Sequence, residues 1–159
     1  MNVFYLDHDP RKAAAYHCDK HCVIMILESA QMLCTAHRII DGSDDAILYR
    51  EAHKNHPSTI WARSDLHHYE WLQTLFSHLG EEFEHRYNKA HKTIVTLSER
   101  LKDAPRLIKK EKFSQPPQCM PDVYKRDCSV DAYRAYYKGE KAGFATWKTK
   151  PPKWFNESG

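Results

Sequence analysis

The residue best suited to chemistry is Glu28, a carboxylate in a run of otherwise apolar residues. The neighbouring segments 23–27 and 29–33 carry mainly aliphatic, methionine and small side chains. Burying an ionised group without a partner is costly, so Glu28 requires either an ion-pair partner or a chemical task. The tasks open to a carboxylate include electrostatic stabilisation of positive charge and proton transfer.

Glu28 shares one helical stripe with other polar residues. Helical spacing places His17, His21, Gln31 and Thr35 on the same stripe. Such a stripe across an apolar helix belongs to a site, faces water, or makes hydrogen bonds within the core. Periodicity leaves all three interpretations open.

A metal site is the weaker interpretation of the histidines. His17 and His21 lie on one helix face, and the chain has 11 histidines, but it contains no HExxH motif. The other close pairs lie in different segments: His53 with His56, and His67 with His68. A metal site would require these segments to converge, so we predict no bound metal and no cofactor.

The elements that position these residues are predicted to be helices. Asp9 followed by Pro10 is typical of a helix start. Because neither Gly nor Pro interrupts them, residues 11–38 are predicted to form one long helix. Residues 3–6 are expected to form a short strand or an extended arm. Turn residues predict a turn at 41–45 and a boundary between elements at His56-Pro57. Three-to-four apolar spacing and helix-start residues predict further helices over about 64–87, over 91–102 and from Ser129 onward.

These elements predict a mainly α fold, a compact single-domain helical bundle with long irregular loops and an extended aromatic and basic C-terminal tail. At 159 residues the chain is long enough for one core. Its expected parts are an N-terminal arm at 1–8, a helical core at 9–103, an irregular basic loop at 104–128, and a helix plus tail at 129–159.

Composition favours a cytoplasmic protein with no membrane segment. The mean hydropathy is −0.74, and no uninterrupted apolar run approaches the roughly 18 residues of a membrane span. The first residues lack the basic start and apolar stretch of a secretory signal. Five cysteines without CxxC spacing indicate neither a disulfide framework nor a cysteine zinc site.

Basic residues are concentrated in the C-terminal third. Residues 105–159 hold 12 Lys and Arg against 6 Asp and Glu, whereas residues 1–104 hold 12 against 15. Aromatic residues are interleaved with these cations. This pattern is typical of a protein that binds a polyanion such as nucleic acid, although a solvated basic tail would look the same.

Two ordered motifs resemble the pyrimidine-dimer DNA glycosylase (endonuclease V-type) superfamily, as in a divergent, phage-like member. The segment 19–28, DKHCVIMILE, is similar to the family's catalytic-helix segment. The second motif comprises Asn55-His56-Pro57, Trp61-Ala62-Arg63, Tyr69, Glu81 or Glu82, and Arg86-Tyr87. The resemblance covers roughly residues 15–90 and implies a helical protein that acts on duplex DNA.

Carried over from the family, Glu28 is the catalytic carboxylate, His21 positions the substrate, and the amino group of Met1 is the nucleophile. An amine can form an imine with the sugar, while the carboxylate stabilises charge on the sugar ring and later accepts a proton. The sequence departs from the family pattern at Leu27 and Gln31, where the best-known members carry phosphate-binding arginines.

The expected DNA contacts are made by cations and exposed aromatic residues. Tyr133, Tyr136 and Trp61 are instead expected to pack in the core. The candidates for phosphate, stacking or groove contacts are His17, Lys20, Asn55, His56, Arg63, Lys109, Lys110, Lys112, Arg134, Tyr137, Lys138, Lys141, Trp147, Lys148, Lys150, Lys153 and Trp154.

The sequence therefore predicts a DNA glycosylase, with or without AP-lyase activity, that acts on a damaged or modified pyrimidine in duplex DNA. A role in DNA repair and a monomeric state are expected. The first alternative is a catalytically silent DNA-binding or protein-binding relative of the same fold. A histidine-metal hydrolase is a more distant alternative.

Overall fold

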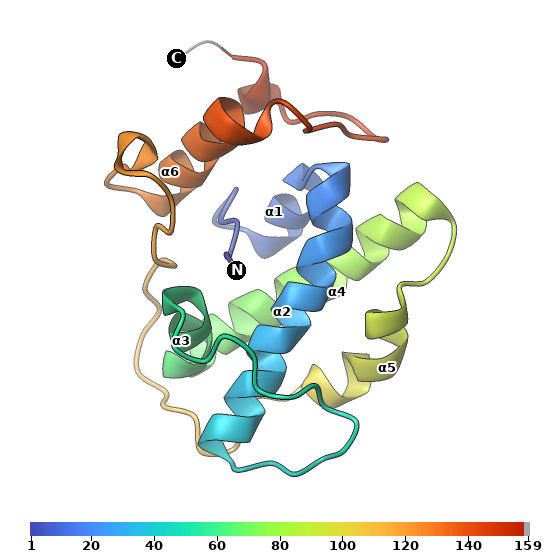
Figure 1. Ribbon diagram of the computed structural model, residues 1–159, viewed down its shortest axis with the longest axis vertical. Helices are drawn as coiled ribbons and strands as arrows, with labels where there is room; N and C mark the ends of the chain where they lie inside the picture. Colours follow the sequence, from blue (N-terminus) through green and yellow to red (C-terminus); the bar gives the residue numbers. More distant parts are fainter. Residues whose placement is uncertain (158–159) are drawn as a thin grey trace.

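The computed structural model describes residues 1–157 and is built from helices (Figure 1). Among the described residues there is no β-strand, which confirms the predicted mainly α class. The α-helices are α1 (Pro10–Tyr16), α2 (Asp19–Ile40), α3 (Pro57–Ser64), α4 (Leu66–Tyr87), α5 (Lys92–Leu101) and α6 (Ser129–Tyr136). Short 3-10 or π turns follow at η1 (Asp122–Tyr124), η2 (Tyr137–Lys141) and η3 (Lys153–Phe155).

The centre of the core lies between the two long helices, α2 and α4. Helix α4 also packs against α1, and both α3 and α5 pack against α2. The apolar stripes predicted from helical spacing are buried here, as Ile26 and Leu33 of α2 and Leu72 and Phe76 of α4 illustrate. Each fully buried aliphatic side chain contributes about 1.5–3 kcal/mol.

The first residues form a buried extended arm rather than a strand. Val3, Phe4, Tyr5 and Leu6 are each at most 5% exposed. The N-terminus lies between α6 and α2 in the middle of the molecule (Figure 1). Arg134 of α6 fixes the end of the arm, because its Nε donates to the Leu6 carbonyl oxygen at 2.8 Å.

The prediction of one helix over residues 11–38 was wrong, because the chain breaks between α1 and α2. His17 and Cys18 are extended, with ψ values of 130° and 163°. The guanidinium group of Arg86 donates to the carbonyl oxygens of Ala15 at 3.1 Å and His17 at 2.8 Å. These tertiary bonds replace the intrahelical bonds that the break removes.

Arg86 also carries the ion pairs at this break. Its side chain is fully buried, and its nitrogens lie 3.2 Å from Asp19 and 2.9 Å from Glu82. Asp19 in turn accepts a hydrogen bond from the Lys148 backbone at 3.0 Å. One buried cation therefore joins α1, α2, α4 and the C-terminal tail.

Helices α4 and α5 begin close to where the sequence predicted, whereas α3 was not predicted, because only a boundary was expected at His56-Pro57. His56, Asp65 and His91 cap α3, α4 and α5, each accepting a hydrogen bond from the backbone two residues ahead. Helix α4 ends at Asn88 in the left-handed conformation with φ of 57°.

Asp65 also anchors the irregular basic loop. The backbone N–H groups of Glu111 and Lys112 donate to its carboxylate at 2.8 and 3.1 Å. Burial opposes ionisation of this carboxyl, but these bonds and those from His67 hold its pKa well below the usual range.

Helix α2 has the length and composition of a membrane span. This property was not predicted from the sequence, because only uninterrupted apolar runs were considered. It contains 22 residues with a mean hydropathy of 1.3 over the most apolar 18-residue window. Half of that window is buried inside the protein. The helix packs against α3, α4 and α5, as the core helix of a helical bundle does.

We expect Arg86→Ala to lower the free energy of unfolding by about 3 kcal/mol, because it removes the hydrogen bonds to two carbonyl groups and the ion pairs with Asp19 and Glu82. Urea unfolding measures this change. As a control, Arg100→Ala removes the more exposed pair with Asp45 and should leave the unfolding midpoint near wild type. Equal midpoints for the two variants would contradict the structural role of Arg86.

Candidate active site

The amino group of the chain lies against the Glu28 carboxylate. The Met1 nitrogen is 3.6 Å from Glu28 Oε1, and the side chains of Met1 and Glu28 are 2% and 24% exposed. Both residues line a cavity of about 310 Å³. The cavity walls are completed by Asn2, Phe4, His21, Ile24, Met25, Tyr136 and Lys141. The pair is therefore open to a small ligand.

The buried arm delivers the amino group to this place. Phe4 stacks on the His21 ring with centroids 4.3 Å apart and an interplanar angle of 25°. Phe4 also contacts Tyr136 and Tyr137 from the end of α6 and the following π turn. Because Phe4 is held from both sides, Met1 has little freedom to leave Glu28.

His21 belongs to the cavity wall, and its role in positioning a substrate stays a prediction. Its Nδ1 lies 2.6 Å from the Tyr137 hydroxyl. Burial, followed by the neighbouring His17, Lys141 and Lys20, lowers the pKa of His21 to about 3. The imidazole is therefore neutral at physiological pH.

His17 lies inside the protein, which corrects its assignment as a DNA contact. Its side chain is fully buried, and its Nδ1 donates to the Ala13 carbonyl oxygen at 2.6 Å. Burial lowers the pKa of His17 to about 4, outweighing that hydrogen bond. The bond fixes its orientation, and the structure gives it a packing role at the end of α1.

Two wall residues come from the C-terminal region. Tyr136 had been expected in the core, and Lys141 had been interpreted as a phosphate contact of the tail. The Lys141 ammonium lies 4.6 Å from the centre of the Tyr136 ring. No local pattern links these residues to Glu28, because only tertiary packing brings them to α2.

His56 of the second motif interacts electrostatically with Met1 and Glu28. Burial, the Met1 ammonium and His53 lower the pKa of His56, whereas Glu28 opposes them. His56 therefore lies within electrostatic reach of the pair. Asn55 beside it is exposed. Arg63 lies further along α3 and has a buried Nη1 without a hydrogen-bond partner among residues 1–157.

The predicted DNA-binding lysines do not form one patch but occupy several separate regions. Lys109, Lys110 and Lys112 are exposed on the basic loop that Asp65 anchors. Lys20 and Lys148 are exposed near the break between α1 and α2, where their ammonium groups lie over the rings of Phe144 and Tyr87. Lys138 and Trp154 line a further hollow of about 360 Å³ beside α6.

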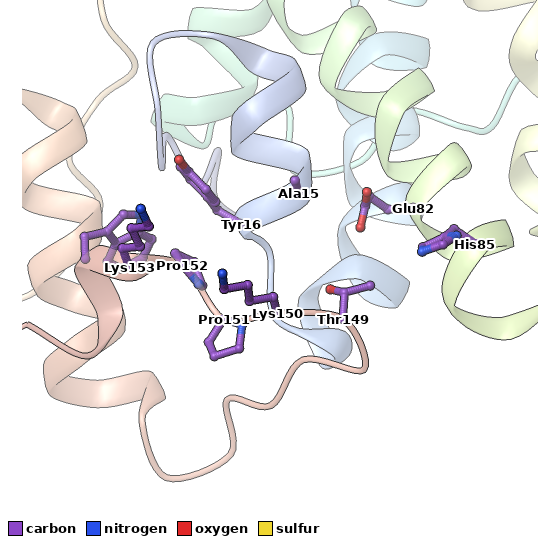
Figure 2. A pocket seen from close by; sticks show the side chains of 10 residues that line it. Ala15, Tyr16, Glu82, His85, Thr149, Lys150, Pro151, Pro152 and Lys153 are labelled. Carbon is purple, nitrogen blue, oxygen red and sulfur yellow. The ribbon is translucent and has the colours of Figure 1, made fainter.

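The C-terminal tail forms a larger hollow away from the amino group. Figure 2 shows Lys150, Pro151 and Pro152 of the tail facing α1, with Glu82 and His85 of α4 beside them. This hollow measures about 550 Å³. The residues that line this hollow include the candidate DNA contacts Lys150, Lys153 and Trp154. Its carboxylate, Glu82, is already paired with Arg86, so the hollow holds no reactive pair comparable to Met1 and Glu28.

The tail tryptophans are partly engaged in packing. Trp147 donates through Nε1 to the Tyr16 carbonyl oxygen at 3.0 Å and contacts Phe155 edge-on. Trp154 contacts the Arg134 guanidinium and the Tyr16 ring. Both are intermediate in exposure, so each has surface left for a ligand.

Within residues 1–157 no three His, Cys, Asp or Glu side chains gather in a way that could hold a metal ion. Comparison of the chain with protein-family models, with curated proteins and with solved structures finds no match. The chemical interpretation therefore rests on the geometry of the site.

Because His17 and His21 are buried in the neutral form, we expect the free energy of unfolding to decrease in acid. Their pKa values of about 4 and 3 lie below the unfolded value of 6.5, so the unfolded state binds more protons below pH 6.5. Their stabilising effect is complete above that pH and decreases by about 1.4 kcal/mol per pH unit for each histidine as the pH falls towards 4.

Urea unfolding between pH 7 and pH 4.5 measures this slope. His17→Gln should make the slope shallower, whereas substitution of the exposed His85 by Gln should leave it unchanged. A slope that is the same in wild type and His17→Gln would contradict the neutral, buried state of His17.

Proposed function

We propose that the protein is a DNA glycosylase that acts on a damaged or modified pyrimidine in duplex DNA and uses the amino group of Met1 as its nucleophile. The observation that carries this proposal is the 3.6 Å approach of that amino group to Glu28 in an accessible cavity. A nucleophile beside a carboxylate is the arrangement that covalent attack on a sugar requires. The resemblance of two sequence motifs to the pyrimidine-dimer glycosylases supports the same reaction.

The proposed reaction begins with the neutral amine attacking the anomeric carbon of the deoxyribose. The bond between that carbon and the pyrimidine nitrogen breaks, and the base leaves with the electron pair and takes up a proton. Glu28 stabilises the positive charge that develops on the sugar ring. Opening of the ring then converts the amine adduct into an imine.

The lyase step uses the same pair. Glu28 removes a proton from the carbon next to the imine, and the adjacent 3′ carbon–oxygen bond breaks with release of the phosphate end of the strand. Water then hydrolyses the imine and restores the amine. A glycosylase without this step would retain base release alone.

The surroundings of the cavity suit a nucleotide that has left the duplex. Phe4 and Tyr136 provide aromatic surface, and Lys141 provides a positive charge at the same wall. Lys20 is exposed one helical turn before Ile24 on α2. Aromatic walls bind flipped bases by stacking, and cations hold the neighbouring phosphates.

Glu28→Gln is expected to reduce base release by about 100-fold or more, the scale seen when one group that stabilises transition-state charge is removed. The assay uses duplexes that carry different lesions or modified pyrimidines and counts abasic sites and nicks. Glu70→Gln changes an exposed glutamate on α4 and serves as the control. Equal rates for wild type and Glu28→Gln would overturn the role of Glu28.

A silent DNA-binding or protein-binding relative is the second candidate. It is favoured by the apolar surface next to Glu28, where Ile24 and Leu27 are 38% and 41% exposed. DNA phosphates would meet no cation at these two positions. Salt-sensitive DNA binding without base release from any duplex would favour this candidate over the enzyme.

A further inference from the structure

The Tyr137 hydroxyl is placed to control the protonation pattern of His21. Tyr137 is fully buried, and its oxygen lies 2.6 Å from His21 Nδ1. The same oxygen accepts a hydrogen bond from the Cys18 backbone N–H at 3.3 Å and lies 3.7 Å from Cys18 Sγ. These three contacts enclose the hydroxyl within the break between α1 and α2.

The single proton of this hydroxyl goes to the best acceptor within reach. An unprotonated imidazole nitrogen is a much stronger acceptor than a cysteine sulfur, and the Nδ1 contact is shorter by about an ångström. Burial raises the pKa of Tyr137 well above its ordinary value, so the hydroxyl keeps its proton. The Tyr137 proton therefore points at Nδ1, which leaves the imidazole proton on Nε2.

The Nε2 atom of His21 is left for the cavity. Phe4 covers one ring face, and Phe144 contacts the ring with centroids 5.5 Å apart. Among the described residues nothing forms a hydrogen bond with Nε2, and this atom is not sealed from solvent as His17 Nε2 is. Because His21 lines the cavity, its free N–H is available to a ligand there.

We infer that His21 is a neutral hydrogen-bond donor to an uncharged oxygen of the substrate, and that Tyr137 is the positioning residue that keeps the donated proton on Nε2. This inference rests on the proposed function, because the substrate oxygen is one close to the anomeric carbon, either the ring oxygen of the deoxyribose or the carbonyl oxygen of a pyrimidine. The low pKa of His21 supports a donor that stays neutral throughout the reaction.

Nitrogen-15 NMR of the histidine side chains tests the positioning role directly in the wild-type protein. At pH 7 we expect His21 to show a protonated Nε2 and an unprotonated, hydrogen-bonded Nδ1. A protonated Nδ1 would overturn the inference. Tyr137→Phe should shift His21 towards a mixture of the two tautomers.

Tyr133→Phe is the matched control for that variant. Tyr133 is also a fully buried tyrosine of the same segment, but its hydroxyl donates to the Pro117 carbonyl oxygen and, within residues 1–157, makes no hydrogen bond to His21. It should leave the His21 spectrum unchanged. An equal response of the spectrum to both variants would show a general packing effect and would contradict the assignment to Tyr137.

Kinetics of base release test the substrate contact. We expect Tyr137→Phe to lower kcat by about tenfold with little change in KM, the scale of about one hydrogen bond. An unchanged kcat would overturn the catalytic part of the inference. If wild-type protein releases no base, the proposed function and this catalytic part fail together, whereas the nitrogen spectrum still decides whether Tyr137 sets the His21 tautomer.

Discussion

The candidate site depends on the burial of the N-terminal arm. The ends of most chains are poorly ordered unless something ties them down, and an amino group that moves freely cannot serve a fixed carboxylate. Here Val3, Phe4 and Leu6 are buried in the core, which stabilises the arm by about 1.5–3 kcal/mol for each large side chain. That burial holds Met1 beside Glu28.

The C-terminal region and Arg86 complete this constraint from opposite sides. Arg134 of α6 bonds to the end of the arm, and Tyr136 and Lys141 close the cavity over it. Arg86 stabilises the break between α1 and α2 by its hydrogen bonds to the carbonyl oxygens there. A new helix, α2, can therefore begin at Asp19, and His21 in its first turn lines the cavity. The N-terminal arm, α2 and the segment around the end of α6 therefore meet at the cavity, and Arg86 supports α2 from the break before it.

Local sequence signals predicted the helices well because caps and apolar spacing are local properties. Asp9 and Asp65 lie at helix starts as expected, whereas α3 was missed because the segment after His56 was interpreted only as a boundary. The break at His17 was not predictable, since its cause is an arginine about 70 residues away. His17 was assigned to the surface for the same reason, because spacing on a continuous helix could not show that it faces the core.

The candidate site was predictable only in part. Glu28 was conspicuous as a carboxylate among apolar residues, and the family resemblance pointed to Met1 and His21. Phe4, Tyr136 and Lys141 were missed as wall residues because no spacing rule connects the arm or α6 to α2. Tyr137 was considered as a stacking surface, whereas the structure buries its ring and directs its hydroxyl at His21.

The most direct measurement is borohydride reduction of the protein mixed with a duplex that contains an abasic site, followed by peptide mapping of the product. Borohydride reduces an imine between an amine and the sugar aldehyde to a stable link. The account predicts one covalent adduct, located on the amino group of Met1. An adduct on a lysine such as Lys141, or no adduct at all, would contradict the claim that the buried arm presents the nucleophile.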